Sequence, residues 1–420
     1  MPDIQALVSD LASKLRKRRV QGSYETARLT AELLCAVILQ HKEPTTNGAA
    51  SLIEAVRRVG EQLIAANPVE LAVGNIVRHV LHIIREEDLS PLTDIVGELK
   101  LSAEDDVEDI AEDENSQKSS ATTDGCLLKP PLLLAVFEHL PDSATACQTF
   151  SSENIFAGKA DKSAKKLKSE LIKAVNELIE DINTCREGIA EQAMELIHQK
   201  YFSTNTQYYI LLISEVILTL GHSKFVKEFL CAAKEKKRSF EVFIADGAPK
   251  FEGHILAKEL DKKGLKAIVI TDSAVFAMIS RVNMVIVGVH AVMANGGVIA
   301  PAGLHVLALA AKKHDVPFVV VASTHELCSL YPHNLEVLLN EMRCPSELLN
   351  FEEFSDCIDY GIASSSSLLH VVNPAFDYVP PELISLFVTD IGGYSPSYIY
   401  RLIADYYSSE DLPPQQKPAS

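Results

Sequence analysis

The sequence predicts an α/β protein in which an N-terminal helical domain is followed by a doubly wound parallel sheet. In the first hundred residues, apolar side chains recur every three or four positions, which is typical of amphipathic helices. From residue 207 onward, short apolar runs alternate with helical stretches, and this alternation predicts parallel strands with helices on both faces. We therefore expect a helical domain at residues 1–101 and a Rossmann-like sheet domain at residues 206–407.

Three apolar patterns predict the helices of the N-terminal domain. The first helix has an apolar face formed by Ile4, Leu7, Val8, Leu11 and Leu15. The second has a face formed by Leu29, Leu33, Leu34, Val37 and Ile38. A third helix is expected to begin at Asn67-Pro68, because proline is tolerated in a first helical turn, and its apolar positions extend to Ile84.

An acidic segment interrupts the helical part. Between Glu104 and Glu114, eight of eleven residues are acidic. Such a stretch cannot bury enough apolar surface to offset the entropy of ordering, so we expect a disordered insert at residues 102–126. It is either a solvated loop or an acidic interaction segment. Residues 127–205 continue the helical part, and apolar steps of three and four predict one long helix over residues 163–200 that bridges layers or domains.

The sheet domain is predicted from six apolar runs of strand length and the helical stretches between them. The runs are Val216–Thr219, Phe240–Ala245, Ala267–Thr271, Met284–Val287, Phe318–Ala322 and Leu368–Val372. The helical stretches include Phe225–Lys234, His254–Lys262 and Ala302–Lys312. A last helix is expected to open at Ser395-Pro396, and residues 408–420 are expected to form a flexible tail.

Composition excludes several classes of function. The 57 acidic and 39 basic residues give a formal net charge of −18, which argues against direct binding of nucleic acid. The start lacks the pattern of a signal peptide, and the longest apolar runs are far too short to span a membrane. The eight cysteines contain no C-x-x-C pair, which favours buried thiols over a zinc site. We expect a cytosolic protein with no membrane contact, no metal and no cofactor.

Ligands of a doubly wound sheet bind outside the carboxyl ends of its strands. The polar and glycine residues at those ends are Gly221, His222, Ser223, Asp246, Asp272, His290 and His325. Neither G-x-G-x-x-G nor G-x-x-x-x-G-K-[ST] occurs, which disfavours dinucleotide and nucleoside-triphosphate sites.

Two kinds of chemistry could be assembled from these residues. Ser223, His290 and Asp246 could be read as a hydrolase triad, but with 13 histidines in the chain chance proximity is the better explanation, and no G-x-S-x-G is present. His222, His290 and His325 could hold a metal if they converge, although nothing in their spacing requires it.

Two strings carry a resemblance to a known family. Near the C-terminus the chain reads NPAFDYVPPELI from Asn373, and near the N-terminus it reads ANPVELAVGNIVR from Ala66. Both resemble the regulatory subunits (alpha, beta and delta) of eukaryotic translation initiation factor 2B. The resemblance extends from about residue 5 to residue 407. Isomerases acting on methylthioribose-1-phosphate and ribose-1,5-bisphosphate share that fold.

The resemblance implies that isomerase chemistry has been lost. Isomerase relatives carry a cysteine after an I-L-T-H strand end, an aspartate in V-G-A-D and a phosphate-binding arginine in E-x-R-P. The matching positions here are Gly221, His290 and Ala248. Isomerisation needs a proton donor and acceptor and a cation for the phosphate, so we expect no catalytic residue. The resulting vestigial pocket comprises Gly221, His222, Asp246, Ala248, Asp272, His290 and Asn295.

A glycine-rich turn also matches the family, from Ala294 to Ile299 and on to Gly303. Such a turn either binds phosphate at a helix N-terminus or allows close packing of a strand against a helix. Because alanine at position 248 replaces the arginine, we favour packing.

The resemblance implies a non-catalytic regulatory and structural subunit of the guanine-nucleotide exchange factor for initiation factor 2. Exchange itself would belong to the epsilon subunit. The implied partners are the alpha, gamma, delta and epsilon subunits and the alpha subunit of initiation factor 2. The candidate subunit contacts are Phe376, Asp377, Tyr378, Val379 and Leu383. The candidate substrate contacts on the Asn67 helix are Glu70, Arg78, Arg85 and Glu86. Two rival hypotheses are a sugar-phosphate isomerase using other residues and a subunit that senses nucleotides or sugar phosphates.

Overall fold

A computed structural model of the chain describes residues 4–20, 22–41, 48–104, 153–197, 215–332, 342–348 and 371–411. The chain divides into two compact units, one of Met1–Asp88 with Lys166–Ser420 and one of Leu89–Lys165. The second unit contains the later turns of helix α4 (Leu71–Glu104) and the first turns of helix α5 (Glu153–Leu196). The candidate site belongs to the first unit.

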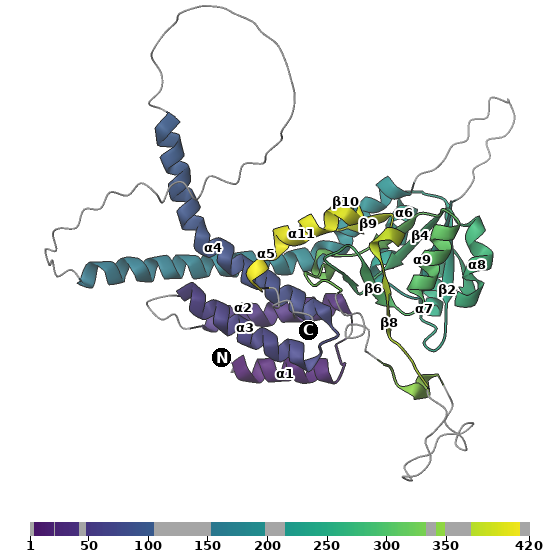
Figure 1. Ribbon diagram of the computed structural model, residues 1–420, viewed down its shortest axis with the longest axis horizontal. Helices are drawn as coiled ribbons and strands as arrows, with labels where there is room; N and C mark the ends of the chain where they lie inside the picture. Colours follow the sequence, from purple (N-terminus) through teal and green to yellow (C-terminus); the bar gives the residue numbers. More distant parts are fainter. Residues whose placement is uncertain are drawn as a thin grey trace, which may run out of the picture. The chain divides into compact units, whose positions relative to one another are not determined.

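The N-terminal helices of the first unit pack around one apolar core (Figure 1). They are α1 (Ile4–Arg16), α2 (Ser23–Gln40), α3 (Gly48–Ala66) and the first turns of α4. The predicted apolar faces point into this core: Leu15, Leu34 and Ile76 are each at most 1% exposed. Helix α4 begins at Leu71, after a turn that contains Pro68, and not at Asn67-Pro68 as predicted.

Helix α5 contributes to two cores of the first unit. Its side chains Leu171, Val175 and Ile182 are buried with the N-terminal helices. About two and three turns after Ile182, Ile189 and Ala193 are buried against the sheet. The steps of three and four therefore predicted both the helix and its bridging role, although the helix begins at Glu153, earlier than expected.

Seven of the described strands form one sheet in the order β10-β9-β7-β4-β1-β2-β3. They are β1 (Glu215–Leu220), β2 (Phe240–Asp246), β3 (Lys266–Thr271), β4 (Met284–Gly288), β7 (Phe318–Val321), β9 (Leu386–Thr389) and β10 (Gly392–Tyr394). All neighbours are parallel except β9 and β10. The chain runs outward from β1 through β2 to β3 and then returns to β4 on the other side of β1. The topological switch therefore lies between β1 and β4.

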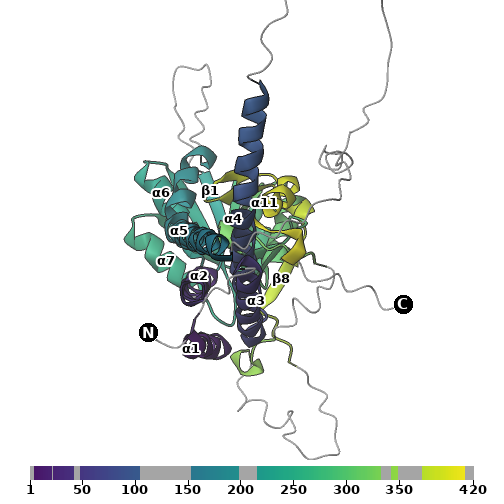
Figure 2. The same cartoon turned by 90° about the vertical axis from the view of Figure 1, so that its left-hand side faces the viewer.

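Helices cover both faces of this sheet. Helices α6 (Lys224–Glu235), α7 (Gly253–Lys262) and the end of α5 cover one face, and Ile217 of β1 points toward them. The other face carries Leu218 and packs against α8 (Val275–Met278), α9 (Leu304–Lys313) and α11 (Ile399–Tyr406). In Figure 2, α6 and α7 lie to the left of β1 and α11 to its right. The doubly wound architecture is thus confirmed.

A small antiparallel sheet was not predicted. Its strands are β5 (Ala291–Val292), β6 (Val298–Pro301) and β8 (Phe376–Val379), with β6 in the middle. Two of these segments adjoin glycine or proline pairs, which look like turns in a sequence, and β8 pairs with a strand far away in the chain. These strands have only two to four residues, too few for an alternating pattern of apolar and polar side chains to be recognised.

Three further expectations differ from the structure or lie outside it. The predicted strand Leu368–Val372 is wrong at the two residues that are described, since Val371 and Val372 have no strand structure, and β9 occupies the position beside β7. The expected flexible tail at 408–420 is wrong at Ser409–Asp411, which form a 3-10 helix, and its residues from 412 onward lie outside the described ranges. Most of the acidic insert lies outside the described residues, although Glu104 still belongs to α4. Within the described ranges, no helix is both long and apolar enough to cross a membrane.

Candidate functional site

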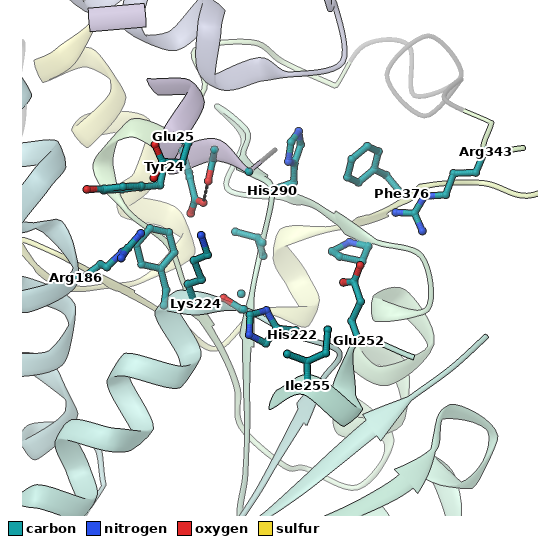
Figure 3. A pocket seen from close by; sticks show the side chains of 18 residues that line it. Tyr24, Glu25, Arg186, His222, Lys224, Glu252, Ile255, His290, Arg343 and Phe376 are labelled. Carbon is teal, nitrogen blue, oxygen red and sulfur yellow. Dashed lines mark hydrogen bonds between the residues drawn. The ribbon is translucent and has the colours of Figure 1, made fainter. Parts of the chain in front are cut away.

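A cavity of about 500 Å³ lies at the topological switch of the sheet. It is lined by residues that follow β1, from His222 to Phe225, and by the end of β4, from Gly288 to His290. The start of α2, from Gly22 to Glu25, completes the wall together with α5 (Figure 3). The cavity is therefore where a doubly wound sheet is expected to bind a ligand, with the N-terminal helices contributing to its lining.

Two of the predicted pocket residues, His222 and His290, line this cavity. The Nε2 atom of His222 lies 3.1 Å from Oε2 of Glu259. Burial alone would raise the pKa of Glu259, but the contacts with His222 and Lys227 hold that pKa below its ordinary value. His222 is thus held by a carboxylate of α7 and does not converge with other ligands on a metal. In the described part of the chain, no three potential metal ligands lie close together.

His290 is occupied by contacts that join the two parts of the first unit. Its Nε2 lies 3.2 Å from the carbonyl oxygen of Val69 and 3.9 Å from Oε1 of Glu70. Its ring stacks on Phe376, with centroids 4.6 Å apart and an angle of 27° (Figure 3). Nε2 of His290 donates to a backbone carbonyl that precedes α4, so the position that matches the isomerase aspartate makes a structural contact here.

The inner wall of the cavity contains a buried carboxyl group that sequence reasoning missed. Glu326 is 1% exposed, and burial raises its pKa to about 8, so that the side chain is protonated at neutral pH. Its Oε1 lies 2.5 Å from the hydroxyl of Ser23, and its Oε2 accepts the N–H of Ser323 at 3.2 Å. The hydrogen bond to Ser23 fastens the start of α2 to the sheet domain.

Arg186 and Tyr24 form the wall next to Glu326. The guanidinium of Arg186 lies over the Tyr24 ring, 4.1 Å from its centroid. Beneath them His325 is 3% exposed and contacts the rings of Tyr24 and Phe225, and burial lowers its pKa to about 3. His325 is therefore neutral and packed in the interior. The predicted strand end is correct, but its histidine does not face the cavity.

Asp246 and Asn295 of the predicted pocket stabilise turns and do not line the cavity. Oδ1 of Asp246 accepts the N–H groups of Gly247 and Gly253 at 3.1 and 3.0 Å, which fixes the start of α7. Oδ1 of Asn295 accepts the N–H of Gly297 at 3.0 Å, and its Nδ2 donates to the Tyr378 hydroxyl at 2.7 Å. A side chain on Gly297 would collide with that tyrosine. The glycine-rich turn thus packs closely, although its partner at Gly297 is strand β8 and not a helix as expected.

The remaining pocket candidates also lie outside the cavity lining. Ala248 and Asp272 are exposed in turns after β2 and β3. Gly221 adopts a left-handed backbone with φ of +60°, and no atom lies within 4 Å of the position where a Cβ would stand. A cysteine would fit that space, but its backbone would be strained. Of the three positions that the resemblance matches to isomerase catalytic residues, Gly221 has no side chain, Ala248 is not among the lining residues, and His290 contacts Val69 and Phe376.

The predicted subunit contacts are mostly used within the chain. Oδ2 of Asp377 accepts the N–H of Gly303 at 2.6 Å and of His305 at 3.4 Å, so this carboxylate caps α9. Val379 is fully buried, and Tyr378 holds the Asn295 turn. Phe376 and Leu383 are half-buried. An anion therefore already occupies the helix N-terminus that follows the glycine-rich turn.

The predicted substrate contacts differ widely in exposure. The side chains of Glu70 and Arg85 are 11% and 23% exposed, and Arg78 is half-buried. The side chain of Glu86 is 65% exposed. Only Glu86 of the four therefore has a largely exposed side chain, and its Oε1 lies 3.2 Å from Nε2 of His82. Arg85 instead forms ion pairs with the C-terminal segment.

Comparisons with known proteins identify the family to which this cavity and its surroundings belong. The family model described as "Initiation factor 2 subunit family" matches residues 135–396, more than half of the chain. The chain belongs to the initiation factor 2 subunit family. Within this family it is 38% identical to the Dictyostelium discoideum protein named "Translation initiation factor eIF2B subunit beta", over 95% of this chain and 94% of the relative. The Schizosaccharomyces pombe protein of the same name is 33% identical, over 96% of both chains.

A solved structure of the initiation factor 2 subunit family has the same fold. The "tetrameric eIF2B-beta2-delta2 complex" from Chaetomium thermophilum contains a chain that matches with a TM-score of 0.61 and 22% identity. The match covers 97% of this chain and 96% of that one. The helical N-terminal region and the mostly parallel sheet with flanking helices are therefore shared with that chain.

Proposed function

We propose that this chain is a non-catalytic regulatory subunit of the guanine-nucleotide exchange factor for translation initiation factor 2. The observation that carries the proposal is the match to two eIF2B beta subunits over nearly their whole lengths. The site supports it, because Gly221 and Ala248 cannot supply the thiol and the phosphate-binding cation of the isomerases, and Nε2 of His290 is bonded to the carbonyl oxygen of Val69. The chain thus has the fold that the isomerases share but not their full set of catalytic groups.

The partners follow from the same relatives. The Chaetomium thermophilum complex contains delta subunits beside beta subunits, which supports a delta subunit as a direct partner of this chain. We propose the alpha, gamma and epsilon subunits of the exchange factor as further partners, with exchange catalysed by the epsilon subunit. We also propose that the complex recognises its substrate through the alpha subunit of initiation factor 2. We place the assembly in the cytosol. Phe376 and Leu383 remain proposed subunit contacts, and Glu86 remains the proposed substrate contact.

Affinity purification of the tagged chain from its own cells, followed by mass spectrometry, tests this function. We expect all four other subunits to be recovered in near-stoichiometric amounts. A matched control is a chain with Asp10→Asn, at an exposed carboxylate of α1 outside the proposed contacts, which should retain the partners. Recovery of the chain without any of these subunits would contradict the proposal.

A second candidate is a subunit that senses a small anion. Three cationic side chains line the cavity, Arg186, Lys224 and Arg343, and within the described residues none of them forms an ion pair with a carboxylate. Of the three carboxylates there, Glu25 already contacts Arg28 at 3.2 Å, Glu252 lies 3.6 Å from Lys250, and Glu326 is protonated. The lining is therefore net positive. Calorimetry with inorganic phosphate, a hexose phosphate and GTP tests for saturable binding, with Arg343→Met as the variant that should abolish it.

A further inference from the structure

The end of the chain leaves the sheet domain at a well-anchored point. Helix α11 is buried against the sheet through Ile399, Leu402 and Ile403. The residue after it, Tyr407, is 7% exposed, and its hydroxyl donates to the carbonyl oxygen of Leu327 at 2.7 Å. The position of the chain at Tyr407 is therefore fixed relative to the sheet.

Four residues later the chain is attached to the N-terminal helices. Oδ1 of Asp411 accepts hydrogen bonds from Arg57 of α3 at 3.0 Å and from Arg85 of α4 at 2.9 Å. Nε of Arg85 donates to the other oxygen, Oδ2, at 3.1 Å. Arg85 also contacts Glu410. One carboxylate thus receives three N–H groups from two different helices.

The exposure of these groups shows which contact dominates. The side chain of Asp411 is 1% exposed, whereas that of Glu410 is 69% exposed. Burial alone would raise the pKa of Asp411, but the hydrogen bonds from Arg85 and Arg57 hold it below its ordinary value. Charge-assisted hydrogen bonds to a buried carboxylate are strong, and an exposed ion pair contributes little. Asp411 is therefore the attachment and Glu410 is peripheral.

Aromatic packing extends the attachment along α4. The ring of His79 lies 5.1 Å from that of Tyr406 and 6.1 Å from that of Tyr407, both edge to face. Burial lowers the pKa of His79 to about 4, so the ring is neutral and packs as an aromatic group. The segment from Tyr407 to Asp411 therefore spans from the sheet core to α3 and α4.

We propose that residues 407–411 form a strap that holds α3 and α4 in place on the sheet domain, with the Asp411 carboxylate as its fastening point. The strap would set the orientation of the helical surface that carries Glu86. The regulatory effect of the strap rests on the proposed function. If the helical surface recognises the substrate, its orientation relative to the rest of the complex must be fixed.

Hydrogen exchange measured by mass spectrometry on the isolated full-length chain tests the strap. Asp411→Asn keeps the shape of the side chain and removes its charge. We expect amides of α3 and of α4 up to Asp88 to exchange at least tenfold faster, while those of β1, β2 and β4 keep their rates. Glu410→Gln is the matched control and should change neither group. Unchanged rates in α3 and α4 of Asp411→Asn would overturn the proposal.

Two further measurements keep the test decisive. If Asp411→Asn also loses protection in the strands, Arg57→Met gives the milder variant, since the Arg57 side chain is 41% exposed and its loss leaves Arg85 in place. Faster exchange in α3 alone is then expected, and its absence would reject the strap. The variants are afterwards assembled with the other subunits and assayed for nucleotide exchange. An altered response to phosphorylated substrate supports the regulatory role. A normal response in a loosened helical domain would contradict that role while leaving the structural strap intact.

Discussion

Changing Glu326 to glutamine should stabilise the chain at neutral and alkaline pH. Glu326 is buried where the start of α2 meets the sheet domain, and its pKa is raised from 4.5 to about 8. Burial is the main cause, and the nearby carboxylates of Asp390 and Glu70 act in the same direction. Glutamine can accept the Ser323 N–H and donate to the Ser23 hydroxyl. It would preserve the local contacts without an ionisable group.

The magnitude follows from the difference between folded and unfolded pKa values. Because the folded value is higher, the stability contributed by the bound proton is complete below pH 4.5 and disappears as the pH rises through about 8. At 1.36 kcal/mol per pKa unit, the whole effect is about 5 kcal/mol, of which about 3 kcal/mol is lost by pH 7. The free energy of unfolding of a domain is typically about 5–15 kcal/mol. A loss of about 3 kcal/mol is therefore large enough to be seen in an unfolding experiment.

Thermal and denaturant midpoints of the wild type and of Glu326→Gln, measured from pH 5 to pH 9, provide the assay. The advantage of the variant should be smallest at pH 5 and grow by about 1 kcal/mol per pH unit up to pH 8, where it levels off. Glu382→Gln, at an exposed carboxylate, is the control and should follow the wild type. Parallel profiles for wild type and Glu326→Gln would refute the assignment of a buried, protonated carboxyl group.

Four other outcomes are expected. The purified chain should not isomerise aldose phosphates, and turnover that disappears in His290→Asn would show that the site has kept its chemistry. Asp377→Asn should lower stability by about 1 kcal/mol, because the cap of α9 loses its charge, and a chemical denaturation curve unchanged from wild type would contradict this. Phe376→Ala should reduce recovery of delta and gamma subunits more than it lowers the melting temperature of the isolated chain; equal losses would make Phe376 a core residue only. Glu86→Lys should alter inhibition by phosphorylated substrate with basal exchange unchanged, since rim charges act mainly on specificity and association rate, and identical inhibition curves would exclude this contact.

Much of the architecture could be predicted because burial leaves a periodic trace. The long apolar spacing from Leu171 through Ile189 predicted α5, and the same spacing showed that it reaches two cores. The runs that became β1, β2 and β4 are apolar because parallel strands are covered on both faces. No such trace marks β6 and β8, whose pairing joins Val298 to Val379. Pairing over that distance depends on tertiary packing, and the apolar run at Leu368–Val372 was mistaken for the strand that β9 provides.

Only part of the cavity lining could be predicted from the sequence, for a related reason. His222 and His290 follow strands, and the rule for the carboxyl ends of parallel strands located them. Tyr24, Arg186 and Arg343 come from α2, α5 and a segment before β8, and no local pattern links these elements to the strand ends. The buried Glu326 could have been suspected from its place three residues after Ser323, since the two form a capping box, but its contact with Ser23 depends on how the helical domain docks.

The most direct test of the regulatory assignment is release of labelled GDP from initiation factor 2 by a reconstituted exchange factor, with and without phosphorylated substrate. The chain alone should release no GDP above the spontaneous rate. The complete complex should be inhibited by phosphorylated substrate, and omission of this chain should weaken that inhibition while the epsilon subunit still catalyses exchange. Catalysis by the chain alone, or equal inhibition with and without it, would contradict a non-catalytic regulatory role.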